Sequence, residues 1–324
     1  MLRWDEVTFG PGSACLGAME VVGIAGTSQG DVWLLGSVGV TPPLELSLWH
    51  WDGAPWTEVI RAPGLVRGPY HPPGLALDGA GQPIVWGMWA ESQRNAIIRV
   101  DGGVWSDLSP PSPWSDATGS PLGIGSVTVT QDGSVWAAVN GRIVRRSSAG
   151  WAEAPTAGDW EALHVDSLWF ASPTSGWAFA WEAKEMGGIG FGRWDGTSWS
   201  RWSVSSDVAA AVWSGPAIWG SAPDDLFLSG LHWDGTTWSF APGVGGDAFA
   251  SLGPHGAISF RLVSLYPSPG YLTRVWTWDG AMWTEKNDGI GAALKEKGEY
   301  GRAWGTSMSN LWLGVGGVYP GGGG

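Results

Sequence analysis

One phrase, Trp-Asp-Gly-x-x-Trp, recurs through this chain of 324 residues and limits the choice of fold more than any other feature. Full copies begin at Trp51, Trp194, Trp233 and Trp278. Weaker copies, and a partial one at the N-terminus, extend the series, so that its closing tryptophans are Trp4, Trp56, Trp105, Trp151, Trp199, Trp238 and Trp283. A period of about 45 residues is typical of repeat folds such as propellers. The 27 Trp outnumber the Tyr and Phe together, which indicates that Trp fills one structural position many times.

A second phrase lies upstream of the closing tryptophans and has the form apolar strand, polar turn, apolar strand. Its clearest copies are residues 26–36, 129–136, 219–228 and 304–314. Each repeat therefore contains two hairpins, or four short strands, in about 45 residues, which is the length of one propeller blade. The chain has room for about seven such units.

The two ends of the chain carry complementary parts of one repeat. The last upstream phrase ends near Gly316 without a closing tryptophan, whereas Trp4 has no upstream phrase before it. In a ring, the N-terminal strand would complete the C-terminal blade and remove two open sheet edges. The third strand of that blade must then come from Val318–Tyr319 or be missing.

The predicted fold is all-β, a seven-bladed β-propeller of four-stranded antiparallel blades that forms one domain over residues 1–324. The N-terminal strand is expected to complete the C-terminal blade. The predicted blades are residues 21–59, 74–108, 124–153, 163–202, 217–240, 246–285, and 303–319 with 2–8.

These phrases resemble the WDGxxW-type β-propeller repeats of bacterial proteins of uncharacterised function, in which a WG(S/T)xxDVWxxG hairpin is paired with a WDGxxW hairpin. The resemblance covers nearly the whole chain and implies a propeller, but it implies no fixed activity. The repeat differs from that of WD40 proteins, because here Asp-Gly occupies a turn and no recurring His–Asp pair is expected.

The recurrence of Trp, Asp and Gly in the WDGxxW phrase has a structural explanation that requires no ligand. Glycine adopts positive φ at no steric cost, and the aspartate side chain can accept hydrogen bonds from the backbone amides that follow it. The flanking tryptophans bury large rings and are expected to pack against the neighbouring blade. We therefore interpret the seven closing tryptophans as structural.

Composition excludes several other classes of protein. With 53 Gly and 22 Pro the chain is too rich in helix breakers for a helical bundle, while 44% hydrophobic residues provide an ample core. The net charge of −13 repels nucleic acid and anionic membrane surfaces, and no apolar run is long enough to insert into a membrane. The lone Cys15 belongs to no disulfide or zinc pattern, so neither a metal nor a cofactor is expected.

Loop length varies at two of the four connections in each repeat. If the strands of a blade are lettered A to D, the A–B and C–D turns are short, whereas the other two classes are often long. The long B–C connections are 36–47, 88–96, 181–190 and 263–272, and the long D–A connections are 60–73, 109–122, 203–216 and 286–302. Both classes open on the same face of a propeller, where binding residues are expected to gather.

Aromatic residues on this loop face have two possible roles that the sequence leaves open. Each ring either wedges between adjacent blades or offers a stacking platform to sugar rings and apolar side chains. On the D–A connections these aromatic residues are Tyr70, Trp114, Trp160, Trp213, Phe249 and Tyr300, while Trp89 and Trp181 begin long B–C connections. The candidate partner-binding residues are thus Tyr70, His71, Trp89, Trp114, Trp160, Trp181, Trp213 and Tyr300.

No catalytic pattern emerges. His50 and His232 occupy matching positions beside WDG turns and read as structural, and no HExxH or similar metal-ligand spacing occurs. Glu182 with Glu185 could be imagined as an acid and base pair, but nothing selects them. The glycines of 187–192 lack the lysine and helix of a phosphate loop, so this segment is expected to be a flexible start to a strand.

The function that fits best is a non-enzymatic binding or scaffold module that engages a protein partner through the loop face. A carbohydrate-binding lectin is the alternative, and a hydrolase or lyase with an axial cleft is a third hypothesis. We expect a monomer unless the chain is part of a larger assembly. The absence of a secretory signal favours the cytoplasm, but an exported domain cut from a longer chain also fits the composition.

Overall fold

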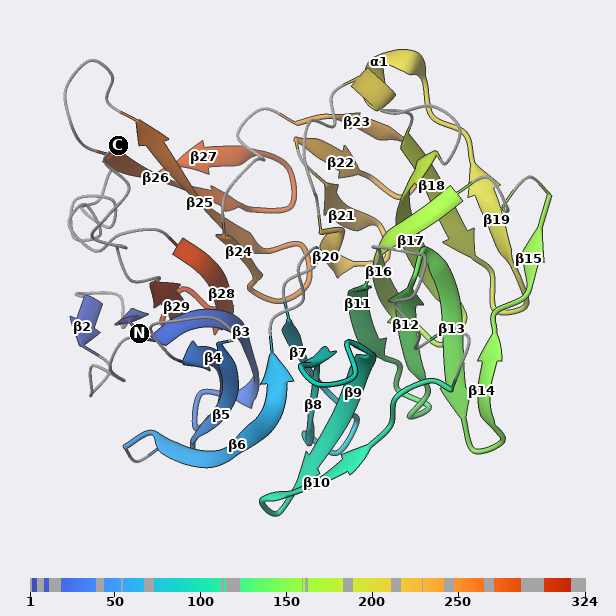
Figure 1. Ribbon diagram of the computed structural model, residues 1–324. Coiled ribbons are helices and arrows are strands. Elements are labelled where there is room, and N and C mark those ends of the chain that lie inside the picture. Colours follow the sequence, from blue (N-terminus) through green and yellow to red (C-terminus); the bar gives the residue numbers. More distant parts are fainter. Residues whose placement is uncertain are drawn as a thin grey trace, which may run out of the picture. The chain divides into compact units, whose positions relative to one another are not determined.

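A computed structural model shows an all-β protein built from several four-stranded antiparallel sheets (Figure 1). Among the residues it describes, α1 (Ser206–Ala210) is the only α-helix. With five residues it is too short to span a membrane. The chain divides into two compact units, one of residues 1–61 with 242–324 and the other of residues 62–241. The described residues are 2–4, 9–11, 19–38, 44–53, 55–66, 73–111, 114, 123–158, 160, 163–182, 189–210, 217–228, 230–241, 248–264, 271–286 and 300–315.

Among the described residues, the strands of both units fall into sets that each follow one predicted repeat, and three of these sets belong to the first unit. The first set is β3 (Met19–Ser28), β4 (Asp31–Val38), β5 (Glu45–Trp51) and β6 (Thr57–Val66), which leads into the second unit. The second set is β24 (Ala248–Ser251), β25 (Ala257–Ser264), β26 (Tyr271–Trp278) and β27 (Trp283–Glu285). The third joins both ends of the chain in the order β2 (Phe9–Pro11), β1 (Leu2–Trp4), β29 (Asn310–Val315) and β28 (Tyr300–Ser307).

The second unit contains four more sets. These are β7 (Gly74–Leu77), β8 (Pro83–Trp89), β9 (Asn95–Asp101) and β10 (Val104–Asp107); β11 (Ile124–Val129), β12 (Val135–Val139), β13 (Arg142–Ser147) and β14 (Gly150–Glu153); β16 (Leu163–Ser172), β17 (Ser175–Glu182), β18 (Ile189–Trp194) and β19 (Trp199–Trp202); and β20 (Trp219–Ala222), β21 (Asp225–Leu228), β22 (Leu231–Trp233) and β23 (Trp238–Phe240). In addition, β15 (Thr156–Ala157) runs parallel to β19, and the end of β6 pairs with β8.

The N-terminus provides two strands to the sheet that contains the C-terminal hairpin. Trp4 pairs with Leu311 on one side and with Phe9 on the other. In a full WDGxxW copy the first, opening tryptophan pairs with the closing one five residues later, as Trp194 does with Trp199. Trp4 pairs in the same way with Phe9, so Trp4 is the opening residue of its repeat and Phe9 the closing one. Our assignment of Trp4 as a closing tryptophan is therefore corrected. The third strand is β1, so Val318–Tyr319, which lie outside the described residues, are not needed for it.

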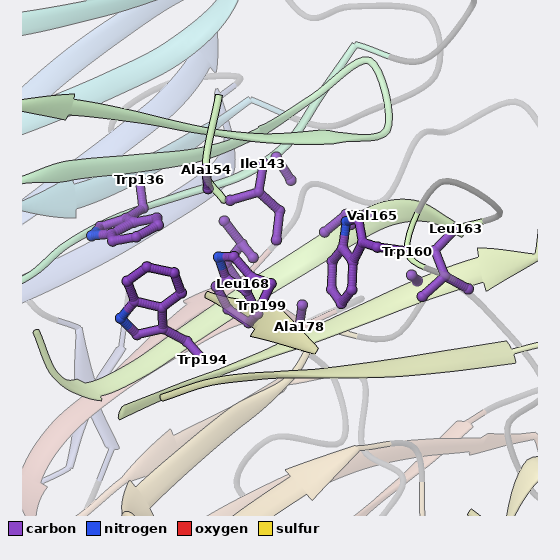
Figure 2. Close-up of a cluster of buried hydrophobic side chains, with 12 residues drawn as sticks. Trp136, Ile143, Ala154, Trp160, Leu163, Val165, Leu168, Ala178, Trp194 and Trp199 are labelled. Carbon is purple, nitrogen blue, oxygen red and sulfur yellow. The ribbon is translucent and has the colours of Figure 1, made fainter. Parts of the chain in front are cut away.

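Tryptophans of the repeat form clusters that join neighbouring sheets. Trp136 of β12 lies 5.0 Å from Trp194 and 6.2 Å from Trp199, the two cross-strand partners that flank the WDG turn of the next sheet. Figure 2 shows these three rings grouped in the core, with Trp160 beyond them beside Leu163 and Val165. The same arrangement joins Trp177 to Trp233 and Trp238, and Trp312 to Trp51 and Trp56. Since indole rings are large, this repeated contact explains why Trp is so abundant.

The Asp-Gly pair of each WDG turn adopts the conformation that its chemistry favours. The glycines have φ between +92° and +99°, at Gly53, Gly196, Gly235 and Gly280. Asp195 Oδ1 accepts hydrogen bonds from the amides of Thr197 and Ser198 at 2.8 and 2.9 Å, and the aspartates at 234 and 279 do the same in their turns. These bonds hold the pKa of all three carboxyls below its usual value, and that of Asp195 at about 2.

Because of these turns, we expect the folded protein to become less stable in acid. A carboxyl with a lowered pKa in the folded state stabilises the fold above its ordinary pKa of 3.8, and this contribution is lost as the pH falls towards about 2. We expect Asp195 to titrate near pH 2 when its carboxyl carbon is followed by NMR. Asp195→Asn keeps the acceptor oxygen and should remove only this part of the pH dependence. A titration midpoint near 3.8 would contradict the prediction.

A His–Asp pair does recur, contrary to the expectation from sequence. In the first copy, Nε2 of His50 lies 2.7 Å from Oδ1 of Asp31, and the hydroxyl of Thr27 donates to the other carboxylate oxygen. The imidazole stacks on the ring of Trp33, with centroids 4.0 Å apart. The four side chains thus join the first hairpin of the repeat to the third strand.

The second copy has the same construction in a more buried setting. Nε2 of His232 lies 2.8 Å from Oδ1 of Asp225, Ser221 donates to the same carboxylate, and the imidazole stacks on Phe227. Asp225 and His232 are only seven residues apart, whereas Asp31 and His50 are nineteen apart. The two separations differ because the B–C loops differ in length. The histidine nevertheless faces the same position of the second strand in both copies, so the recurrence is visible in the strand register and not in the sequence spacing.

Arginine occupies the histidine position in four other sheets, as Arg3, Arg99, Arg145 and Arg193, and the structure describes the side chains of the last three. Arg145 lies over the ring of Trp136 at 5.0 Å, and Arg193 lies over Trp177 at 5.1 Å. Arg99 faces Ile84 in the same register and instead forms an ion pair with Asp78 at 3.0 Å. In these three sheets the guanidinium group lies over the facing residue where that residue is a tryptophan, at Trp136 and Trp177. This cation–π arrangement is favourable.

Candidate functional site

The loop-bearing ends of the sheets are the candidate site. Because each set of strands is antiparallel, its B–C and D–A connections emerge at the same end. In the second unit the structure describes two B–C connections there completely, residues 90–94 and the turn Asn140–Gly141. Most of the other long connections lie outside the described residues.

The turn between β12 and β13 is built from two residues with positive φ. Asn140 has φ of 50° and Gly141 has φ of 79°, which are the values of a tight type I′ hairpin turn. Asn and Gly are the residues that tolerate these angles best, so the dipeptide itself determines the turn.

Asn140 connects segments that are distant in the sequence. Its Nδ2 donates to the backbone carbonyl oxygen of Trp114 at 2.9 Å, and its backbone N–H donates to the carbonyl oxygen of Gly123 at 3.1 Å. Its Oδ1 accepts a 3.4 Å hydrogen bond from Nδ2 of Asn95, which is 3% exposed at the start of β9. The amide side chain therefore holds together the B–C turn, a D–A connection and the neighbouring sheet.

His164 extends this group towards the next sheet. The carbonyl of Gly141 accepts a 2.9 Å hydrogen bond from the backbone of Val165, and the exposed His164 lies directly over Gly141. A Cβ on Gly141 would come within 2.5 Å of the imidazole Nδ1. We call Asn95, Trp114, Asn140 and His164 the Asn140 cluster, in which His164 is exposed, Trp114 and Asn140 are half-buried and Asn95 is buried.

The connection at 90–94 is compact rather than extended. The sequence suggested a loop over 88–96, but β8 continues to Trp89 and β9 begins at Asn95. Trp89 N donates to Arg94 O at 2.9 Å, Gln93 N donates to Trp89 O at 2.8 Å, and Gln93 itself has φ of 55°. Residues 91–94 are exposed, so this turn holds charged and amide side chains at the surface in a fixed conformation.

Of the predicted contact aromatics, Trp160 is buried and cannot serve as a platform. It is 6% exposed and packs 5.8 Å from Trp199, over the backbone of Gly192, where a Cβ would lie 2.1 Å from the indole. The wedge interpretation therefore holds for Trp160, and its assignment as a partner-binding residue is corrected. The same packing gives glycine a structural role in 189–192, where β18 is a regular strand rather than a flexible start.

The other candidates have mixed surroundings. Trp114 and Trp181 are half-buried and pack against core clusters of the second unit, and Phe249 is also half-buried. Trp89 is half-buried, 5.5 Å from the ring of Trp105. Tyr300 lies in β28 but its side chain, like all of Tyr70, His71 and Trp213, lies outside the described residues.

The closing tryptophans are not equivalent in burial. Trp56, Trp199 and Trp238 are at most 7% exposed, and Trp151 and Trp283 are half-buried. Trp105 is the exception at 39% exposed, so a buried wedge role does not apply to it. Its cross-strand partner is Val100 instead of tryptophan, so the paired indoles of the full copies are absent at this hairpin.

The titratable residues form no cluster suited to a metal among the ranges described here. Of the carboxylates considered as an acid and base pair, Glu185 lies outside those ranges, as does the side chain of Glu182. Sequence reasoning missed Asn95 and the grouping of Asn140 with His164. The Asn-Gly dipeptide after an apolar strand signalled the turn, but nothing local signalled that residues 45 positions apart meet there.

Comparison with known proteins shows the fold. No protein-family model matches the chain, and no curated protein matches its sequence. The GH74 (NkGH74) enzyme of Niastella koreensis is similar in structure, with a TM-score of 0.60 and 14% identity over 98% of this chain and 53% of that one. A protein of B. thetaiotaomicron, BT3049, described as the extracellular domain of a hybrid two component system, has a TM-score of 0.54 and 12% identity over 93% of this chain and 39% of that one.

This chain thus spans about half the length of the GH74 enzyme and less of BT3049. At such low identity the likeness concerns architecture only. Together with the four-stranded antiparallel sheets, it shows that the chain is a β-propeller-like all-β protein.

Proposed function

We propose that the chain is a seven-bladed propeller, closed by its N-terminal strands, that acts as a non-enzymatic binding module for a protein partner. The pairing of β1 with β29 supports closure, since it places strands from both ends of the chain in one sheet. Contact with the partner is assigned to the loop-bearing strand ends, where the Asn140 cluster and the turn at 90–94 lie.

The observation that carries this proposal is the fixed, exposed polar surface at these strand ends. Residues 91–94 and His164 are exposed, yet the backbone beneath them is held by hydrogen bonds from Gln93 and Asn140. A preformed surface loses little conformational entropy on binding, which favours affinity. A polar, solvent-accessible rim around aromatic residues is also the usual anatomy of a protein interface.

A glycan is the less favoured ligand. Stacking on a sugar ring requires an exposed aromatic face, and Trp160 is buried while Trp114 is half-buried in the core. At these two positions the structure therefore offers no fully exposed aromatic face on which a sugar could stack. Amide groups such as those of Asn95 and Asn140 are already occupied in holding the turn.

The test is to shorten the turn with the chain's own template. Replacing residues 90–94 by Asn-Gly copies the Asn140–Gly141 turn and removes the exposed side chains of 91–94 while keeping the hairpin. In quantitative affinity capture from the source cells, we expect a defined set of proteins to be lost with this variant and kept with the unaltered chain.

The matched control lies at the other end of β9. Gly102–Gly103 have φ of 56° and 81°, so Asn-Gly can replace them in a similar turn geometry. This control should retain every captured protein. If the shortened variant folds and still captures the same set, the proposal is wrong; a positive glycan array that depends on residues 90–94 would favour the lectin instead.

A further inference from the structure

The outer strand β10 is an exposed sheet edge with apolar side chains. All four of its residues are exposed, and among the described residues no strand pairs with its outer side. Val104 is 71% exposed and Trp105 39% exposed. Folded proteins usually cover, shorten or charge such edges, because an unpaired edge can accept another strand.

The hydrogen-bond phase of the hairpin shows which backbone groups of β10 face outward. Leu108 N donates to Ile97 O at 2.8 Å, so Leu108 and, two residues before it, Ser106 form the hydrogen-bonded pairs with β9. Trp105 and Asp107 are therefore at non-hydrogen-bonded positions of that ladder, and their N–H and C=O groups point away from the sheet.

The chain itself shows how such an edge is covered. Trp199 of β19 occupies the same repeat position as Trp105, since each is the closing residue opposite the opening position of its hairpin. The outward N–H of Trp199 donates to Pro155 O at 2.8 Å, and β15 then continues alongside as a parallel strand. Figure 1 shows β15 beside β19 and no strand outside β10. Trp199 is fully buried, whereas Trp105 is not.

We propose that β10 binds an extended segment of a partner protein, which adds to the sheet as a parallel strand in the way that β15 adds to β19. Main-chain hydrogen bonds from Trp105 and Asp107 would provide affinity, and side-chain contacts would provide selectivity. The segment carries an apolar residue against Trp105 and a basic residue against Asp107, since these two side chains lie on the same face of the strand.

Charge determines the nature of the occupant. Asp101 and Asp107 are both exposed beside this edge, and the whole chain has a net charge of −13. A second copy of the same acidic chain is therefore repelled, while a basic segment is attracted. The outward backbone groups of β10 are distinct from the Asn140 cluster, because the β10 hairpin turn and Asn95 lie at opposite ends of β9, while the ring of Trp105 contacts that of Trp89 beside the turn at 90–94.

A labelled strand peptide tests this inference directly. In the probe peptide every second residue is Thr, and the residues between are Val and Lys, so that Val and Lys lie on one face of the strand. Binding of this peptide to the full chain is followed by fluorescence anisotropy. Trp105→Ala should weaken binding by about tenfold or more, because it removes the central apolar contact. Methylation of the alternate peptide amides that would face β10, or Glu in place of Lys, should weaken it to a similar extent.

Met282→Ala is the matched control, since Met282 is an exposed apolar residue, 60% exposed, at another hairpin tip. This variant should bind the probe as the unaltered chain does. Hydrogen exchange of the Trp105 and Asp107 amides should slow when the probe is bound. Equal binding by the Trp105→Ala variant or by the methylated peptide would overturn the inference, as would a dimer of the free chain that protects these amides.

Discussion

Replacing Trp199 by alanine is expected to lower the free energy of unfolding by about 3–5 kcal/mol, the usual cost of removing a buried aromatic ring. Trp199 is fully buried and contacts Trp136, Trp160 and Trp194 at centroid distances of 5.7–6.2 Å. Its loss would leave a cavity between two sheets that rigid neighbouring rings cannot fill. Urea unfolding followed by far-ultraviolet circular dichroism measures the effect.

The same substitution at Trp105 is the internal control. This residue occupies the equivalent repeat position but is 39% exposed, so its replacement should cost less than about 1 kcal/mol. Equal losses at the two positions would show that burial does not decide the role of the closing tryptophan. A small loss at Trp105 would also establish that the Trp105→Ala variant is folded when it is used in the peptide experiment.

Replacing Gly125 by alanine is expected to destabilise the second unit by about 1–3 kcal/mol or more, because the added methyl group has no space. A Cβ at this position would lie 2.1 Å from the carbonyl oxygen of Asp166. That oxygen belongs to the backbone of β16, so relief would require β11 and β16 to move apart. The register of β11 already shifts between Ile124 and Ser126, where the strand bulges beside this contact.

Gly30→Ala is the appropriate comparison for this change. Gly30 has open space around its Cβ position and is not among the glycines with positive φ, so alanine should cost almost nothing there. Chemical denaturation of both variants gives the two free energies. If Gly125→Ala is as stable as Gly30→Ala, the close approach of β11 to β16 is not a constraint on the sequence.

Much of the architecture could be predicted because its determinants are local. The Asp-Gly turn depends on angles and hydrogen bonds within a few residues, and the observed bonds from Thr197 and Ser198 to Asp195 are of that kind. Apolar runs on either side of polar turns then predict the strands, such as β4 and β12. The four-stranded antiparallel sheets follow from these short-range features, whereas the number of blades in a closed ring stays a prediction.

The phase of the terminal repeat was harder to predict. Trp4-Asp5-Glu6 matches either flank of the phrase by sequence, since Trp occurs at both positions. Only the register of Trp4 with Leu311 and Phe9 shows that it is the opening residue. Pairing between the two ends of a chain depends on tertiary contact, and no local preference records it.

The repeated hairpins, with glycine at the positive-φ positions and tryptophan on either side, follow from local sequence, because those choices depend on the residue and its near neighbours. The role of each copy depends instead on how the sheets pack. Trp199 is buried and Trp105 exposed although both close a hairpin, and Asp225 meets His232 as Asp31 meets His50 at a different spacing. Burial and pairing depend on which strand comes to lie alongside, and that is a property of the packed sheets.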